Sequence, residues 1–167
     1  LKYSELIHFG LTSEDINSPC YVMMIKDSIN NVINPIISQI INKLKQICEA
    51  FKGVTMCGLT HGQSASPTTL SKELFVFVYR LEKILNREVI FSAKMSGSIG
   101  NMTVHKICFP EIEWNQFFDY FFEEKLDLKR NKFTTQIDNY DDLCQVFFKY
   151  QQINNVLIDL CQDIWLY

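Results

Sequence analysis

No apolar run in this sequence approaches the roughly 20 residues that a helix needs to cross a bilayer, and no secretory leader is visible. Basic residues are sparse as well: the longest basic run is Lys129-Arg130, and the net charge is −3. This balance argues against nucleic-acid binding through bulk electrostatics, although a local basic pocket for one phosphate is still allowed. Phosphate loops of the Gly-x-x-x-x-Gly-Lys type, nucleophile elbows and dinucleotide fingerprints are also missing. We therefore expect a globular protein that contacts neither membranes nor nucleic acids.

Cysteine pairs at metal-binding spacing are absent too. None of the six cysteines forms a Cys-x-x-Cys pair or clusters with histidine. Most lie on apolar helical stripes, where a free thiol behaves as a small hydrophobe. The sequence thus predicts no metal site and no structural disulfide, and it indicates a reducing, cytoplasmic compartment.

Few glycines and prolines interrupt the chain, and apolar residues recur every three or four positions over long stretches, which is the helical pattern. The predicted helices cover residues 14–51, 67–93, 111–125 and 139–167. The fold class is therefore all-α, a bundle of long helices. The first helix would be about 55 Å long at 1.5 Å per residue, too long for a compact domain of this size. We expect residues 1–167 to be one helical-bundle domain that belongs to something longer.

Two of these helices have clear start signals. Ser13 can cap the first helix, and Glu14 and Asp15 suit the positive end of its dipole. Ser66 is a good cap for the second helix, and Pro67 suits its first position, where the missing N–H costs nothing. Pro35 should kink the first helix midway.

A polar stretch, Thr60–Thr69, surrounds one of only three histidines, His61. Imidazole titrates near neutral pH, as a general acid or base must. The neighbouring hydroxyls and the carboxamide of Gln63 favour a functional site at a helix start, where anions are stabilised. A histidine that only bonds nearby backbone is the alternative, and the pattern alone does not decide between them.

A second polar loop contains His8, Thr12 and Ser13. Hydroxyls, an imidazole and free N–H groups at a helix start can bind a phosphate or a carboxylate. Gln136, beside two threonines between helices, could present an amide to a substrate. His105 has no polar neighbours at motif spacing, and we predict a structural role for it.

Four segments in order carry a family resemblance. They are residues 8–16 (His-Phe-Gly-Leu-Thr-Ser-Glu-Asp-Ile), 60–69 (Thr-His-Gly-Gln-Ser-Ala-Ser-Pro-Thr-Thr), 96–101 (Ser-Gly-Ser-Ile-Gly-Asn) and 134–137 (Thr-Thr-Gln-Ile). Together they resemble the fumarase/aspartase superfamily, and within it the bacterial-type branch that cleaves adenylosuccinate. The resemblance covers essentially the whole chain.

The resemblance implies a lyase of purine biosynthesis. It would release fumarate by β-elimination from adenylosuccinate, leaving AMP, and from the succinyl-carboxamide ribonucleotide. His61 matches the general acid of the family. The positions that match substrate-binding residues are His8, Thr12, Ser13, Thr60 and Gln136. Among them, His8 matches a residue near the phosphate and Thr60 one at a succinyl carboxylate. No metal or organic cofactor is expected, because hydrogen-bond donors and positive groups can stabilise the intermediate.

The resemblance also predicts what this chain does not supply. The general base of the family is a serine on a glycine-rich loop that has no counterpart here, and the N-terminal domain of the family is absent. Family members are homotetramers whose sites combine three subunits. The fragment alone should therefore be inactive. Two alternatives stay open: another lyase of the superfamily, acting on argininosuccinate or as a fumarase, and a non-catalytic helical oligomerisation module.

Overall fold

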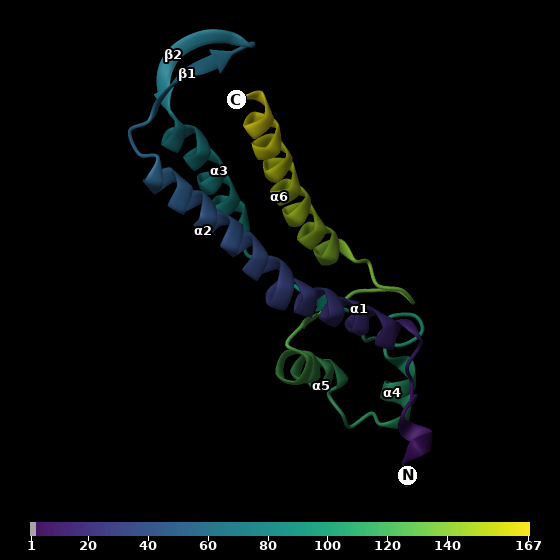
Figure 1. The fold of residues 1–167 in the computed structure, drawn as a ribbon. Helices are drawn as coiled ribbons and strands as arrows, with labels where there is room; N and C mark the ends of the chain where they lie inside the picture. Colours follow the sequence, from purple (N-terminus) through teal and green to yellow (C-terminus); the bar gives the residue numbers. More distant parts are fainter. Residues whose placement is uncertain (1–2) are drawn as a thin grey trace. The chain divides into compact units, whose positions relative to one another are not determined.

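The structure, a computed structural model, describes residues 3–167 apart from the side chain of Glu5, and the chain divides into two compact units (Figure 1). The first, here termed the loop unit, contains Leu1–Ser28 and Val89–Val146. The second, the bundle unit, contains Ile29–Glu88 and Phe147–Tyr167. Each unit has its own hydrophobic core. Within residues 3–167, no helix is both long and apolar enough to cross a membrane.

Three helices form the bundle unit. They are α2 (Asn34–Ala50), α3 (Leu70–Leu85) and, from Phe147 onward, α6 (Asp141–Leu166), which lie alongside one another in Figure 1. Their buried residues recur at steps of three and four, so they share one face of each helix. The core comprises Ile37, Ile41, Leu44, Phe77, Val78, Leu81, Ile84, Ile153, Val156 and Leu160. The all-α prediction and the predicted last helix are confirmed.

The first predicted helix is also confirmed, with an interruption near Pro35. The chain is α-helical over Glu14–Ser28 (α1), π-helical over Ile29–Ile33, and α-helical again through α2. Pro35 lies in the first turn of α2 and has no N–H to donate. A π-helical turn is a known way to absorb such a break in the α-helical hydrogen bonds.

The predicted start of the second helix is wrong. Residues Thr55–Thr60 (β1) and Gln63–Thr69 (β2) form an antiparallel hairpin in which Pro67 pairs with Cys57. Ser66 is therefore part of a strand and caps no helix. A proline suits a helix start, but it is also tolerated in a two-stranded ribbon, where one edge needs no N–H. Ser66 and Pro67 give the same sequence signal for a helix start and for an edge strand. The pairing of β2 with β1 decided between these two structures.

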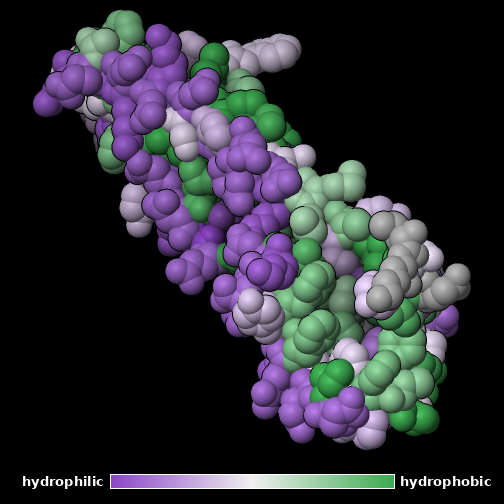
Figure 2. Space-filling model, turned by 90° about the horizontal axis from the view of Figure 1, so that it is seen from below, coloured by the Kyte–Doolittle hydropathy of each residue, from purple (hydrophilic) through white to green (hydrophobic). Residues whose placement is uncertain are grey.

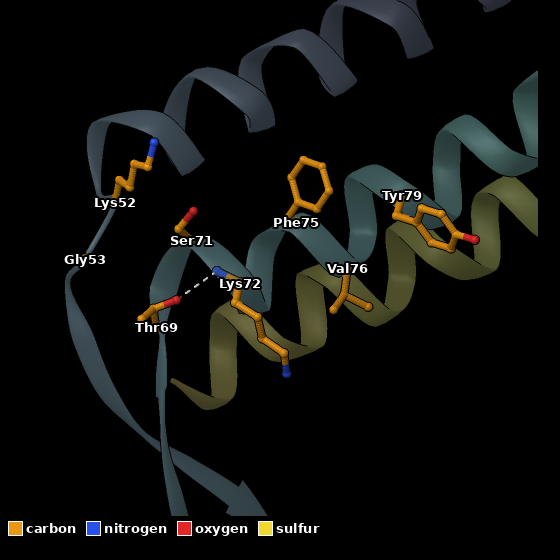
Figure 3. Close-up of a pocket in the computed structure, with 8 residues that line it drawn as sticks. All are labelled: Lys52, Gly53, Thr69, Ser71, Lys72, Phe75, Val76 and Tyr79. Atoms are coloured by element: carbon orange, nitrogen blue, oxygen red, sulfur yellow. Dashed lines mark hydrogen bonds between the residues drawn. The ribbon is translucent and has the colours of Figure 1, made fainter.

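Helix α3 begins at Leu70, with Thr69 as its N-cap. The Thr69 side-chain oxygen accepts a hydrogen bond of 3.2 Å from the backbone N–H of Lys72 (Figure 3). The helix also ends earlier than predicted, at Leu85. Ser92–Ala93, predicted as helical, form a short strand, β3, which pairs in parallel with β4 (Lys129–Arg130).

The reassigned cap leads to a stability prediction. Thr69→Ala should lower the free energy of unfolding by about 0.5–2 kcal/mol, because it removes the acceptor for the Lys72 N–H. Ser66→Ala, an exposed hydroxyl three residues away, should change it by less than about 0.5 kcal/mol. Urea unfolding followed by circular dichroism measures both. A larger effect of Ser66→Ala would instead support the cap predicted from sequence.

The loop unit contains α1, the β3–β4 pair and two short helices. These are α4 (Thr103–Cys108), which the sequence did not predict, and α5 (Trp114–Phe121), which continues as a π-helix over Phe122–Leu126. The buried core residues are Val22, Ala93, Met95, Met102, Phe118, Phe122 and Leu128. A three-residue 3₁₀-helix, Ser4–Leu6, precedes α1.

His105 is buried in the loop unit with 3% of its surface exposed. Its ring lies against the rings of Phe9, Trp114 and Phe118. Burial lowers the pKa of the His105 imidazole, because the charged form is desolvated. This packing agrees with the structural role that was predicted for it.

Candidate active site

His61 lies at the tip of the β1–β2 hairpin. It forms the two-residue turn with Gly62, closed by the pairing of Thr60 with Gln63. All four residues are exposed. Among the described residues, the His61 imidazole has no hydrogen-bond partner, so the alternative of a structural histidine bonded to backbone finds no support. The hairpin presents an exposed imidazole at its tip.

The backbone of this turn is left-handed at both positions. The φ angles are 52° at His61 and 71° at Gly62, as in the type I′ turn that matches the twist of a hairpin. Glycine adopts this conformation freely, whereas a residue with a side chain does so at a cost of roughly 1–2 kcal/mol. His61 is thus held in a costly conformation at the exposed tip of the hairpin, where packing gives no reason for a histidine.

In the loop unit, the carboxylate of Asp15 organises the start of α1. Asp15 is fully buried. Its oxygens accept hydrogen bonds from the backbone N–H groups of Thr12 at 2.9 Å, Ser96 at 2.8 Å and Gly97 at 3.1 Å. The bond from the Thr12 N–H has the three-residue spacing of the return bond in a capping box. The carboxylate therefore joins the Thr12–Ser13 loop to the Ser96–Gly97 loop.

Lys94 neutralises this carboxylate. Its Nζ lies 2.6 Å from Asp15 Oδ1, and both side chains are fully buried. The same ammonium donates to the Gly97 carbonyl oxygen at 2.9 Å. The Lys94 backbone N–H donates to the hydroxyl of Ser18 at 3.0 Å, and Ser18 in turn donates to Asp138. Because both charges are paired and hydrogen-bonded, their burial is tolerated.

The 134–137 segment packs against the loop of residues 96–101. The hydroxyls of Ser96 and Thr134 are 2.7 Å apart and share a hydrogen bond. At Gly100, where φ is +82°, an added Cβ would come within 1.8 Å of the Thr134 carbonyl oxygen. Only glycine permits this close approach of the two backbones. Gln136, two residues beyond Thr134, is exposed.

The structure thus brings three of the four motif segments together in the loop unit. Of the predicted substrate-binding residues there, His8, Ser13 and Gln136 are exposed and Thr12 is half-buried. Thr60 and His61 belong to the bundle unit.

Sequence reasoning missed the Asp15–Lys94 pair. It took Asp15 only as a favourable charge at a helix start and assigned no role to Lys94. The spacing Thr12-x-x-Asp15 could have suggested a capping box, but Lys94 carries no comparable signal.

A hollow of about 520 Å³ lies at the base of the hairpin, between the end of α2 and the start of α3 (Figure 3). Its lining residues are Lys52, Gly53, Thr69, Ser71, Lys72, Phe75, Val76 and Tyr79. Most of the surface that lines the hollow is apolar, and none of the six predicted site residues contributes to it. The hollow is therefore separate from the candidate site. Among residues 3–167, no group of three histidine, cysteine or acidic residues is placed to hold a metal ion.

The chain is thus largely helical, with an exposed histidine at a hairpin tip and polar loops joined by a buried ion pair. A sequence model described as "Lyase" matches residues 1–167, and the chain belongs to that lyase family. The predicted membership of the fumarase/aspartase superfamily, on the adenylosuccinate side, is confirmed.

Several relatives are named adenylosuccinate lyase. The chain is 42% identical to the one from Dictyostelium discoideum, over 100% of this chain and 38% of that protein. It is 41% identical to the one from Legionella pneumophila strain Corby, over 96% of this chain and 36% of that protein. It is 35% identical to the one from Escherichia coli K12, over 98% of this chain and 36% of that protein. The chain spans little more than a third of the length of these relatives.

A solved structure has the same fold. It is the crystal structure of β-carboxy-cis,cis-muconate cycloisomerase from Acinetobacter calcoaceticus, with a TM-score of 0.82. The match covers 99% of this chain and 38% of that chain, at 17% sequence identity. It therefore supports the arrangement of helices and says nothing about the substrate.

Proposed function

We propose that the protein to which this chain belongs is an adenylosuccinate lyase, a carbon–nitrogen lyase that converts adenylosuccinate to AMP and fumarate. We further propose that residues 1–167 are its central helical domain and that it works in the cytoplasm. The observation that carries the proposal is the exposed, unpaired imidazole of His61 at the hairpin tip, in a chain 42% identical along its whole length to a protein of that name.

In the proposed reaction, a base removes a proton from the carbon next to a succinyl carboxylate. The electron pair forms the new double bond of fumarate, and the carbon–nitrogen bond breaks. His61, in its protonated form, donates a proton to the departing nitrogen, so AMP leaves with a neutral amino group. The base is proposed to come from a segment outside residues 1–167, because the chain spans little more than a third of its relatives.

The other predicted residues have binding roles in this proposal. His8 contacts the phosphate, Thr60 a succinyl carboxylate, and Thr12, Ser13 and Gln136 the rest of the nucleotide. Hydroxyl, amide and imidazole groups supply the donors that an anionic substrate needs. His8, Ser13, Thr60 and Gln136 are exposed and Thr12 is half-buried, which leaves them accessible to a ligand. The succinyl-carboxamide ribonucleotide carries the same succinyl and phosphate groups, and we propose it as a second substrate.

Exposed apolar side chains support a proposed assembly into homotetramers with shared sites. Figure 2 shows that hydrophobic side chains make up part of the face in view. On the helices of the bundle unit, the large exposed apolar residues include Ile36, Phe75, Val76, Tyr79, Phe147, Phe148 and Ile158. Extended apolar surface of this kind marks a protein–protein contact. In a shared site, Thr60 and His61 of one copy could serve the loop unit of another.

The function is tested by adding adenylosuccinate to the purified complete protein and following the loss of its ultraviolet absorbance. Chromatography should show AMP and fumarate in equal amounts. The isolated 167-residue chain is the control and should release no fumarate. Fumarate release from argininosuccinate alone, or hydration of fumarate alone, would indicate another lyase of the superfamily. No conversion of any of these compounds would favour a non-catalytic helical module.

A further inference from the structure

The three polar segments of the loop unit share one buried connection. The Asp15 carboxylate accepts hydrogen bonds from the backbone N–H of Thr12 in the first segment. It also accepts hydrogen bonds from the backbone N–H groups of Ser96 and Gly97 in the second segment. Lys94 is paired with that carboxylate at 2.6 Å and also holds the Gly97 carbonyl. The side chain of Ser96 then reaches the third segment at Thr134, 2.7 Å away.

This chain of contacts is more than a cap for α1. A capping box would account only for the bond from the Thr12 N–H to Asp15. Here the same carboxylate takes two further N–H donors from a loop 81 and 82 residues away in sequence, and a buried ammonium besides. Ser96 has 1% of its surface exposed, and its hydroxyl forms a hydrogen bond with the hydroxyl of Thr134 and not with its own loop. The segments that carry Thr12, Ser13 and Gln136 are thereby fixed to one another.

We propose that Asp15, Lys94, Ser96 and Thr134 are positioning residues, which hold the segments bearing Thr12, Ser13 and Gln136 in the geometry that binds substrate. The inference rests on the proposed function of these three residues. None of the four positioning side chains needs to touch the substrate. Their effect is to remove the cost of ordering the segments when the substrate binds.

The bond between Ser96 and Thr134 is the part that can be tested without unfolding the protein. Thr134→Val keeps the side-chain shape and removes the hydroxyl, which leaves the buried Ser96 hydroxyl without its partner. Thr134→Ser keeps the hydroxyl and should rescue most of the loss. Thr55→Val is the matched control, because Thr55 is an exposed threonine at the base of the hairpin and outside the proposed site.

In the complete protein, Thr134→Val should raise the KM for adenylosuccinate by about 5- to 30-fold, the weight of one lost buried hydrogen bond. The kcat should stay within about twofold, because the lost interaction contributes to binding and not to proton transfer. Thr134→Ser should stay close to the original KM, and Thr55→Val should not change it. A fall in kcat without a change in KM, or an equal effect of Thr134→Ser and Thr134→Val, would overturn the proposal.

Hydrogen exchange of the 133–137 backbone, measured without substrate, separates this inference from the proposed function. Exchange there should be faster in Thr134→Val than in Thr134→Ser, because the segment opens more easily without its link to Ser96. If the unmodified protein does not cleave adenylosuccinate, the proposed function fails, and the exchange result still decides whether the link orders the segment. Unchanged exchange would overturn the positioning role in either case.

Discussion

Lys94→Met is expected to lower the free energy of unfolding by about 3–5 kcal/mol, the usual cost of leaving a buried charge without its partner. Asp15 would remain at a site with no exposed surface and without its ion-pair partner. Methionine preserves most of the volume of the lysine side chain, so the loss reports the charge and not a cavity. Urea unfolding of the complete protein, followed by circular dichroism, measures the change.

An exposed ion pair of equal length provides the control. Lys45 and Glu82 are also 2.6 Å apart, but their side chains are 44% and 38% exposed. Lys45→Met should therefore change the free energy of unfolding by no more than about 1 kcal/mol, since water screens such pairs. The double variant Asp15→Asn with Lys94→Met should be more stable than Lys94→Met alone, because it removes the uncompensated charge and keeps an oxygen for the backbone donors. Equal effects of Lys94→Met and Lys45→Met would show that burial of the Asp15–Lys94 pair adds nothing to the change in the free energy of unfolding.

His61→Asn should lower the kcat of the complete protein by about 10²- to 10⁴-fold, the usual contribution of a general acid. Asparagine is the informative replacement because φ at His61 is 52°, a left-handed conformation that asparagine tolerates better than alanine does. An alanine variant would combine the loss of the imidazole with strain in the turn. The kcat is measured from the ultraviolet absorbance change on cleavage of adenylosuccinate.

Ser66→Ala is the matched control for this experiment. Ser66 lies on β2 of the same hairpin, is exposed and is not a proposed site residue. Its kcat should equal that of the unmodified protein. If His61→Asn also leaves kcat unchanged, His61 is not the acid, whatever the identity of the substrate.

The long helices were predictable because their signal is local. An apolar residue every three or four positions fixes which face of a helix is buried, and the predicted helices at 14–51 and 139–167 appear at 14–50 and 141–166. His61 was also identified from sequence, as a rare histidine in a polar stretch, and the exposed hairpin tip is compatible with its predicted role.

The hairpin was not predicted in full. Residues Thr55–Thr60 (β1) lay outside the predicted helices, but the last three residues of β2 were assigned to the start of a helix. Pro67 and Ser66 fit either structure, and the choice depends on pairing with β1 across a turn that His61 and Gly62 form. Local propensity gives no information on that pairing, so the predicted second helix begins three residues before α3 does.

The sequence by itself predicted the first and last long helices and the family, since these depend on local spacing and on motifs, and it named the residues to which the proposed chemistry is assigned. Only the tertiary structure showed what holds the polar loops together. Asp15 and Lys94 are 79 residues apart, and nothing near either residue indicates that it is buried. A buried charge is stable only when the fold delivers its partner and its hydrogen-bond donors to the same place.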